Sequence, residues 1–286
     1  MDLRQLKYFL AVAEEGQITK AAKRLNLTQP PLSQQLILLE KELGSQLFNR
    51  GKKHIRLTEA GNILQRRAQQ MMELMKTTVN ELQEATDGIS GRLAIGTISS
   101  SGISLLPNRI QEFHKCYPKV TFHLRQGETL KILELLNVGL IEIGFVRFPV
   151  DYELYDFLIL PEESMVIAAN ANMLQPHIAP FDLCQLMVQP LLVHQRHVPM
   201  ITELCRQGGF DPTFFCTSDD ITPLLIWANL GLGIAIVPES AINLFPGSSL
   251  RFYEMAPPTI KTTSAIIWSK KRPLSASATH FIALFK

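Results

Sequence analysis

The sequence predicts an α+β multidomain protein with a helical N-terminal domain, one long linker helix and a C-terminal two-lobed α/β domain. Apolar residues recur at helical spacing from Leu3 to Leu43 and again through residues 59–88. After residue 92, short apolar strands alternate with helical segments, which indicates a mainly parallel sheet covered by helices. With 286 residues and 46% hydrophobic content, the chain can form cores for more than one domain.

Composition argues against several other classes of protein. Charged residues make up 19% of the chain, which is not the composition of a disordered protein. Apolar runs stay below about 18 residues, so neither a membrane span nor a membrane partner is expected. The N-terminal stretch MDLRQLKYFLAVAEEG combines acidic residues with helical periodicity, so we expect it to belong to a folded domain and not to be a signal peptide.

The cysteines and histidines show no sign of a metal site or a disulfide framework. The four cysteines lie far apart with no CxxC motif, and the seven histidines lack ligand spacing. We therefore expect reduced thiols, a cytoplasmic location, and neither a metal nor another cofactor.

The net charge of +2 conceals an asymmetry along the chain. Residues 1–67 contain 12 Lys and Arg against 6 Asp and Glu, a net charge of +6. The remaining residues contain 16 against 20, a net charge of −4. A basic N-terminal end suggests a polyanion as partner, although an ordinary solvated surface explains the charge equally well.

The first two predicted helices are short and joined by a small turn. An amphipathic helix carries its apolar face from Leu3 to Ala13 and ends at Gly16. The segment ITKAAKRLN forms a second helix, whose inward side consists of small alanines. Asn26 follows where a tight turn requires a residue that tolerates a positive φ, and Leu27 fills that turn.

A third helix is predicted to begin at two prolines. Thr28 is a good N-cap residue, and Pro30 and Pro31 then lie in the first turn, where backbone N–H groups have no partner within the helix. An apolar stripe follows up to the stop at Gly44 and consists of Leu32, Leu36, Leu39 and Leu43.

Two helices joined by a tight turn, with alanines at their crossing, describe a helix-turn-helix. The third helix then presents Gln29, Ser33 and Gln34 at its exposed end, where such side chains hydrogen-bond to base edges and phosphates. A helical hairpin within a larger core is the alternative. The next segment, LFNRGKKHIRLT, favours DNA, because it predicts a β-hairpin wing whose basic tip neutralises phosphates.

From Leu3 to Gly61 the chain resembles the N-terminal domain of LysR-type bacterial transcriptional regulators. The match includes the helix-turn-helix, the LEKELGSQLFNR segment and the LTEAG exit. The family often has arginine where this chain has Gln34, so its operator half-site preference is expected to differ. The predicted contacts with double-stranded operator DNA are Thr28, Gln29, Pro30, Pro31, Ser33, Gln34, Arg50, Lys52 and Lys53.

The long helix predicted after the cap residue Thr58 carries a heptad seam. Its members alternate in steps of four and three residues: Leu64, Ala68, Met71, Met75, Thr78 and Leu82. A helix packed on its own domain is the alternative, but the length of the seam favours a dimer coil, as in the linker helix of the LysR-type family. A dimer also gives the two helix-turn-helix units that a pseudo-palindromic operator requires.

The predicted domains are a winged helix-turn-helix at 1–58, the linker helix at 59–88, a hinge at 89–91 and an effector-binding domain at 92–286. Three segments resemble the family's effector domain, which is similar to periplasmic binding proteins. They are GRLAIG, GLIEIGFVR and GLGIAIVPES. We expect lobe I at about 92–160 and 265–286, and lobe II at about 161–264. The resemblance implies a small-molecule effector between the two lobes.

Candidate effector residues lie where predicted strands end and helices begin. They are Ser99, Ser100, Ser101, Thr129, Arg147, Arg196, His197, Val198, Pro199 and Thr222. Hydroxyls at helix starts can hold a carboxylate, although Ser and Thr also cap helices without any ligand. Arg147 and Arg196 together suggest an anionic effector, namely a small organic acid.

Two rival classes were weighed against a regulator. An enzyme on a two-lobed fold is disfavoured because the sequence contains no GxSxG, GxxxxGK[ST] or HExxH motif. A transport binding protein would need a signal peptide and would leave the N-terminal domain without a role. We therefore expect a non-enzymatic regulator that forms dimers or, by further assembly, tetramers. It is expected to change transcription through altered contact with RNA polymerase or altered bending of DNA.

Overall fold

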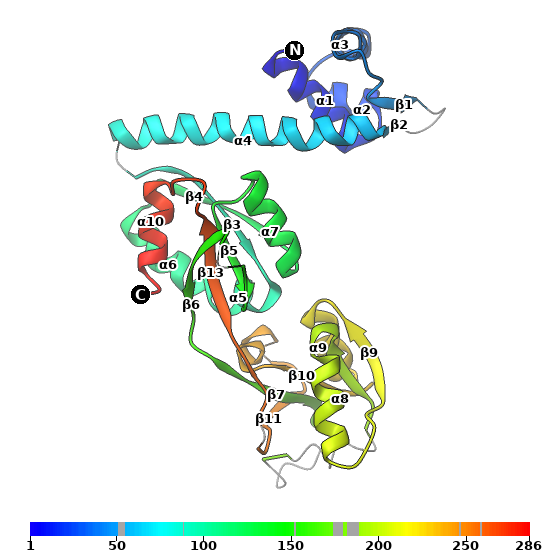
Figure 1. The fold of residues 1–286 in the computed structure, drawn as a ribbon, viewed down its shortest axis with the longest axis vertical. Coiled ribbons are helices and arrows are strands. Elements are labelled where there is room, and N and C mark those ends of the chain that lie inside the picture. Colours follow the sequence, from blue (N-terminus) through cyan, green and yellow to red (C-terminus); the bar gives the residue numbers. More distant parts are fainter. Residues whose placement is uncertain are drawn as a thin grey trace. The chain divides into compact units, whose positions relative to one another are not determined.

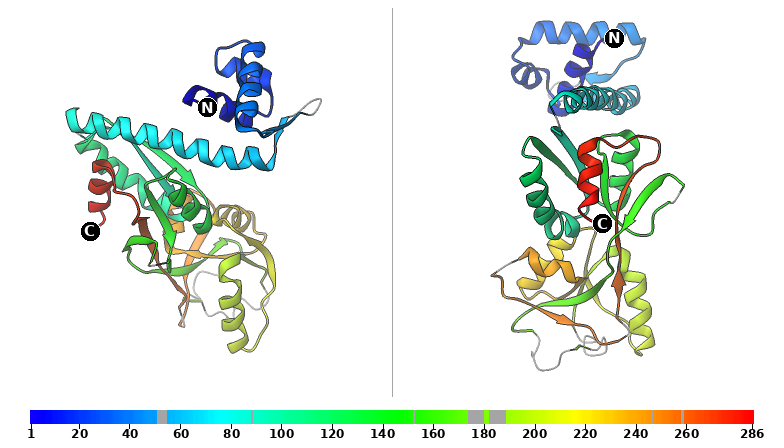
Figure 2. Two further views of the ribbon diagram at one scale, coloured as in Figure 1. Left: turned by 45° about the horizontal axis from the view of Figure 1, so that its top comes forward. Right: turned by 90° about the vertical axis from the view of Figure 1, so that its left-hand side faces the viewer.

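The computed structural model describes residues 1–50, 55–87, 89–151, 153–173, 180–181, 189–245, 247–257 and 259–286. The chain divides into two compact units, an N-terminal unit up to Thr86 and a C-terminal unit from Asp87 (Figures 1 and 2). The described helices contain none that is long and apolar enough to cross a membrane.

The N-terminal unit is a helix-turn-helix followed by a hairpin and a long helix. Its elements are α1 (Leu3–Glu15), α2 (Ile18–Arg24), α3 (Gln29–Leu43), β1 (Phe48–Arg50), β2 (Ile55–Leu57) and α4 (Glu59–Asp87). Left-handed residues separate the helices as predicted, because φ is 64° at Gly16, 54° at Asn26 and 62° at Gly44. These turns bring α1, α2 and α3 around one core.

That core confirms most of the predicted apolar pattern. Ala21 and Ala22 are buried, as are the three leucines of the α3 stripe up to Leu39. The prediction for Leu43 is wrong: its side chain is 38% exposed, because it lies in the last turn of α3, beyond the core. Leu3, in the first turn of α1, is exposed for the same reason.

The hairpin and the start of α4 are tied to the end of α3. The Glu40 carboxylate accepts hydrogen bonds from the backbone N–H groups of Leu47 (2.8 Å) and Phe48 (3.2 Å). Thr58 caps α4 as predicted, since its hydroxyl accepts from the Gly61 N–H at 3.0 Å. Gly61 also lies so close to Leu47 that an added Cβ would be 2.2 Å from the Leu47 carbonyl oxygen.

The predicted seam of α4 is divided into two parts. Leu64 and Ala68 pack into the core of their own unit, so the alternative reading is correct for the first heptad. Beyond them the apolar side chains face outward: Met71 is 43% exposed and Leu82 is 66% exposed. The seam also omits Leu74, which is 69% exposed.

Lobe I of the C-terminal unit contains a five-stranded sheet in the order β4-β3-β5-β13-β6. Its strands are β3 (Gly91–Thr97), β4 (Val120–Gln126), β5 (Ile143–Arg147), β6 (Tyr155–Ile159) and β13 (Ser264–Ser269). Its helices are α5 (Ser99–Ser104), α6 (Leu106–Cys116), α7 (Thr129–Val138) and α10 (Ala276–Ala283). β3 starts at Gly91, so the last residue of the predicted hinge belongs to the sheet.

Helices cover both faces of the lobe I sheet. α6 and α10 pack on one face through Phe113 and Phe281, which lie in one core cluster. On the other face, α7 approaches the strands at the paired residues Gly96 and Gly144. An added Cβ would be 3.0 Å from an Ile132 carbon at Gly96 and 2.7 Å at Gly144, so glycine permits this close packing. The packing fixes the start of α7 beside the ends of β4 and β5.

Lobe II contains a second sheet in the order β11-β7-β10-β8-β9, with β12 paired to β7. Its strands are β7 (Glu163–Asn170), β8 (Leu191–His194), β9 (Phe214–Ser218), β10 (Ile234–Pro238), β11 (Leu250–Glu254) and β12 (Lys261–Thr262). Alternate residues of β7 face α8 (Val198–Gln207) on one side and α9 (Ile221–Asn229) on the other. This alternation is expected for a strand buried on both faces.

Two connections join the lobes. The chain passes from β6 in lobe I to β7 in lobe II, and returns from β12 to β13 (Figure 1). These crossings lie close to the predicted lobe limits, with β7 beginning at Glu163 and β13 at Ser264. The parallel strands of both lobes therefore end near the same junction, which is where a ligand site is expected.

Candidate functional site

The start of α3 is the candidate DNA-reading surface. The two prolines open the helix as predicted, and Leu32 behind them is fully buried in the core. Gln29, both prolines and Gln34 are exposed, whereas Ser33 is partly buried. Thr28 occupies the N-cap position, but the expected capping hydrogen bond of its side chain is absent. Its exposed hydroxyl is therefore not used to cap the helix.

The hairpin after α3 matches the predicted wing. β1 and β2 pair in antiparallel register from Phe48↔Leu57 to Arg50↔Ile55. The backbone of Arg50 ends β1, whereas its side chain and both Lys52 and Lys53 lie outside the described residues. The predicted phosphate contacts of this basic tip stay predictions.

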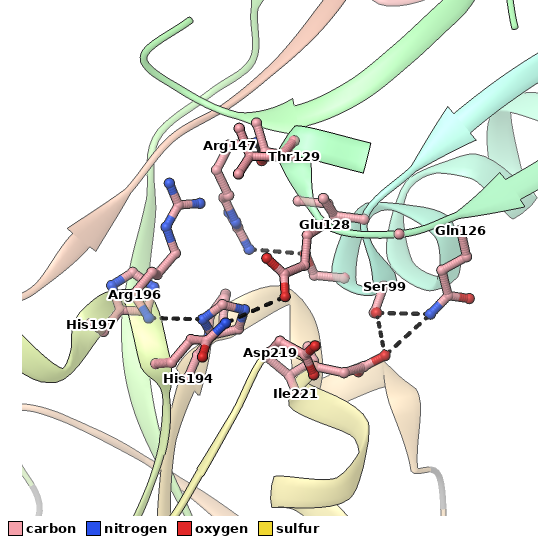
Figure 3. Close-up of a pocket in the computed structure, with 17 residues that line it drawn as sticks. Ser99, Gln126, Glu128, Thr129, Arg147, His194, Arg196, His197, Asp219 and Ile221 are labelled. Atoms are coloured by element: carbon pink, nitrogen blue, oxygen red, sulfur yellow. Dashed lines mark hydrogen bonds between the residues drawn. The ribbon is translucent and has the colours of Figure 1, made fainter. Parts of the chain in front are cut away.

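The C-terminal unit contains a cavity of about 580 Å³ between its two lobes (Figure 3). Its walls consist of strand ends and helix starts. The lining residues are Ile98, Ser99, Ser100, Gln126, Gly127, Glu128, Thr129, Leu130, Arg147, His194, Gln195, Arg196, His197, Asp219, Asp220, Ile221 and Pro238. A cavity of this size suits a small organic molecule.

Six of the ten predicted effector residues line this cavity: Ser99, Ser100, Thr129, Arg147, Arg196 and His197. Four do not. Ser101 is buried within α5, and Val198 packs against the lobe II core. Pro199 lies in the first turn of α8 and is exposed. The Thr222 N–H donates to the Asp220 carboxylate at 2.7 Å, so the start of α9 is already capped.

Arg147 lies in the cavity wall but is committed to protein partners. Its guanidinium donates to Glu163 Oε1 at 2.8 Å, to Ser264 Oγ at 2.9 Å and to Ser100 Oγ at 2.9 Å. Glu163 Oε2 in turn accepts from the Ser240 N–H at 3.1 Å. The charge of Arg147 is thus neutralised by a carboxylate of the other lobe, and the effector contact expected for it stays a prediction.

A second set of contacts joins the lobes beside the first helix of lobe I. The Ser99 hydroxyl donates to Asp220 Oδ2 at 2.8 Å, and the Gln126 amide donates to Ser99 Oγ at 2.8 Å (Figure 3). Burial alone would raise the pKa of Asp220. The hydrogen bonds from Thr222 and Ser99 outweigh burial and hold that pKa below its ordinary value. Asp220 is thus an ionised carboxylate with its acceptors in use.

Glu128 and Asp219 approach each other from opposite lobes. Glu128 precedes α7 of lobe I, and Asp219 precedes α9 of lobe II. Burial raises the pKa of Glu128, and its hydrogen bond and charge repulsion with Asp219 raise it further. The Gln195 amide also reaches Glu128 Oε1, at 3.4 Å.

The basic side chains of the cavity come from the end of β8. Burial lowers the pKa of His197 to about 4, assisted by the nearby His194, Arg196 and Arg147. Burial also lowers the pKa of His194, so both imidazoles are neutral at neutral pH. Partial burial and the charge of Arg147 lower the pKa of Arg196, which nevertheless stays a cation.

Sequence reasoning did not select several of the polar residues that line this cavity, among them Gln126, Glu128, His194, Asp219 and Asp220. Each lies at or just after the end of a strand, which is the signal that selected Ser99 and Arg147. Within the described parts of the chain, no three His, Cys, Asp or Glu residues form a group that could hold a metal ion.

Comparison with known proteins identifies both units. The family model for the bacterial regulatory helix-turn-helix protein of the lysR family matches residues 3–62, and the LysR substrate binding domain matches residues 86–286. The chain belongs to the LysR family. It is a DNA-binding transcriptional regulator with a C-terminal effector-binding domain, as the sequence predicted.

Individual LysR relatives cover the whole chain. The HTH-type transcriptional regulator BudR of Raoultella terrigena is 30% identical over 292 residues, which span all of both proteins. BsdA of Bacillus subtilis (strain 168) is 29% identical over 295 residues, again over both full lengths. These relatives are regulators and not enzymes.

Solved structures show the same architecture. The LysR family regulator CbnR gives a TM-score of 0.82 at 25% identity, covering 99% of this chain and 97% of CbnR. Full-length CbnR in complex with its target DNA also gives 0.82, at 26% identity, covering 100% of this chain and 99% of that one.

Proposed function

We propose that this LysR regulator reads an operator through the first turns of α3 and is switched by a small organic acid between its lobes. The observation that supports the acid is Arg196, which lines the cavity. Its guanidinium forms no hydrogen bond or ion pair with any residue that the structure describes, and only its backbone N–H is engaged, by His194. A carboxylate is the preferred partner of a guanidinium.

Neighbouring groups support the same ligand. The Thr129 hydroxyl accepts from the Arg147 N–H at 3.2 Å, and its own hydrogen stays available for a ligand oxygen. His194 and His197 are neutral, so they add hydrogen-bonding atoms and aromatic surface to the cavity without adding positive charge beside Arg196. Arg147 supports the wall of the cavity from behind and does not contact the acid in this proposal.

DNA recognition is proposed to require a dimer. One α3 reads one half-site, and two related by symmetry read a pseudo-palindrome. The exposed apolar side chains of α4 from Met71 to Leu82 are the surface that supports pairing. The complex of CbnR with its target DNA supports the operator as partner. Dimers then assemble into tetramers that contact RNA polymerase.

Switching follows from differential binding. The cavity has walls from both lobes, so an acid that binds one lobe arrangement more tightly shifts the population toward it. The same shift changes affinity or geometry at the operator, since coupling between two sites is reciprocal. An acid that binds both arrangements equally changes nothing.

Footprinting tests both halves of this proposal. DNase I protection is measured on the neighbouring intergenic region with wild-type protein, with and without small organic acids. The expected result is a protected pseudo-palindrome whose extent changes with an acid. Arg196→Ala should keep the protection and lose the response. Arg206→Ala is the matched control, because Arg206 lies on α8 in an exposed ion pair with Asp211 and should keep both.

A further inference from the structure

The charged groups of the cavity differ in whether they are already paired. Arg147 is neutralised by Glu163, and Asp220 accepts hydrogen bonds from Ser99 and Thr222. These groups hold the lobes and offer little to a ligand. Arg196 is the cation of the lining whose guanidinium N–H groups form no hydrogen bond with any residue that the structure describes. Glu128 and Asp219 are the remaining carboxyls of the lining, and each presents acceptor oxygens.

The remaining groups give the cavity two chemically different sides. Arg196 comes from the short 3₁₀ helix Gln195–His197 that follows β8, whereas Glu128 and Asp219 come from the loops before α7 and α9 (Figure 3). Arg196, Glu128 and Asp219 line the same cavity, and the amide of Gln195, the chain neighbour of Arg196, donates to Glu128 Oε1 at 3.4 Å. A ligand that reaches Arg196 therefore lies beside the two carboxyls as well.

We propose that the effector acid also carries a hydrogen-bond donor, an ammonium or a hydroxyl group, which binds between Glu128 and Asp219 while the carboxylate pairs with Arg196. The inference rests on the proposed function and specifies the chemical class of the ligand. Hydroxy acids and amino acids share this chemistry. In this arrangement Glu128 and Asp219 determine specificity, because they select among acids that Arg196 alone would accept.

The physical reason is the cost of covering carboxyl oxygens whose hydrogen bonds within the protein, such as the 3.4 Å contact from the Gln195 amide to Glu128, leave acceptor capacity unused. An acid with only a hydrocarbon body would displace water from Glu128 and Asp219 and leave their oxygens facing apolar atoms. A site built to hydrogen-bond a polar group strongly rejects the analogue that lacks it. An ammonium group gains further, since it places a positive charge between two carboxyls that otherwise repel each other.

The test compares matched acids on the full-length protein by thermal shift and titration calorimetry. A broad panel is arranged in triplets on one carbon skeleton, such as propionate, lactate and alanine, or 3-phenylpropionate, 3-phenyllactate and phenylalanine. Among the triplets that bind, we expect a donor-bearing member to bind at least about tenfold more tightly than its parent acid. Comparison of the hydroxyl and amino members distinguishes the two kinds of donor.

Variants connect the preference to the two carboxyls. The double variant Glu128→Ala with Asp219→Ala removes the acceptor oxygens, so it should lose the preference within a triplet and keep or improve binding of the parent acid. Glu134→Ala is the matched control: Glu134 lies on α7 in an exposed pair with Lys131, and its variant should keep the wild-type preference. Circular dichroism and melting confirm that each variant is folded.

The outcomes separate this inference from the proposed function. Suppose that acids bind only when Arg196 is present, but bind equally well with and without a donor group, in the wild type and in the double variant alike. That result overturns the inference and leaves the proposed function standing. If no acid of the panel binds the wild-type protein, both are overturned. A donor preference that survives in the double variant also overturns the inference, because other groups must then supply the selectivity.

Discussion

Arg147 at the end of β5 and Glu163 at the start of β7 form a 2.8 Å ion pair that links lobe I to lobe II. The Arg147 side chain is only 8% exposed and the Glu163 side chain 22% exposed. Ser100 and Ser264 accept the other guanidinium hydrogen bonds, so the pair belongs to a network at the lobe junction. The first consequence of this network concerns the stability of the C-terminal unit.

Arg147→Ala should destabilise the C-terminal unit whether or not an effector is present. Removing the cation leaves the Glu163 carboxylate without its partner in a mostly buried position, which costs about 3 kcal/mol. For a unit of this size the melting temperature should fall by roughly 6–12 °C. Thermal unfolding followed by circular dichroism measures the change.

The matched control removes both charges. Arg147→Met combined with Glu163→Leu leaves no unpaired charge, so it should recover most of the lost melting temperature. If Arg147→Ala instead melts like the wild type and only loses effector binding, then Arg147 is a ligand contact and not a structural link.

His197 predicts a specific dependence of stability on pH. Burial lowers its pKa to about 4, against an ordinary value of 6.5. Between pH 6.5 and pH 4 the unfolded chain binds a proton at His197 that the folded chain does not bind. The contribution of the neutral imidazole to the free energy of unfolding is therefore complete above pH 6.5 and is lost as the pH falls toward 4. We expect His197→Gln to reduce the loss of unfolding free energy between pH 7 and pH 5 by about 1 kcal/mol, allowing for partial exposure.

Urea unfolding of both proteins at the two pH values provides this difference. The comparison must be between variant and wild type, because Glu128, with its raised pKa, changes stability with pH in the opposite direction. His114→Gln on the exposed side of α6 is the control and should behave as the wild type does. An equal loss of stability in the His197 variant and the wild type would contradict the assignment.

The exposed part of α4 predicts the oligomeric state. Met71→Glu with Met75→Glu places charge on the surface proposed to pair, so sedimentation should show monomers and operator affinity should fall steeply. Arg66→Glu, on an exposed position off the seam, should leave the mass unchanged. A double variant that sediments with the wild-type mass would show that the subunits pair elsewhere.

Local features of the fold could be predicted from the sequence because their causes are local. Pro30 and Pro31 suit only a first helical turn, and Asn26 and the glycines mark left-handed turns whatever surrounds them. Leu43 extends the apolar stripe but lies beyond the core, and Ala68, expected on the dimer seam, packs into its own unit, because burial depends on which distant element covers each residue. Periodicity identifies an apolar face and not its partner.

The cavity shows the same limit. The ends of the predicted strands indicated that Ser99 and Thr129 would lie at one site, and both line the cavity, because parallel strands bring their ends together. It could not show that Arg147 is neutralised by Glu163, nor that Glu128 meets Asp219, since each pair joins different lobes. Those pairings depend on how the lobes pack, which no short segment encodes.

The exposed end of α3 predicts a change in sequence preference. Gln34→Ala removes an exposed amide that can bond to a base edge, so affinity for the preferred operator should fall by about 1–3 kcal/mol, with relaxed selectivity at one base pair. Competition binding against operators varied at single positions measures this. Ser45→Ala, exposed just beyond the other end of α3, should change neither quantity.

The wing predicts a different signature, because phosphate contacts position the protein without reading bases. Lys52→Ala should weaken binding about equally on operator and unrelated DNA, and should reduce the slope of log affinity against log salt by about 1. Titrations at several salt concentrations measure the slope. If Lys52→Ala changed the order of preference among operators while the salt slope stayed the same, Lys52 would be reading a base and the wing would belong to the sequence-reading surface.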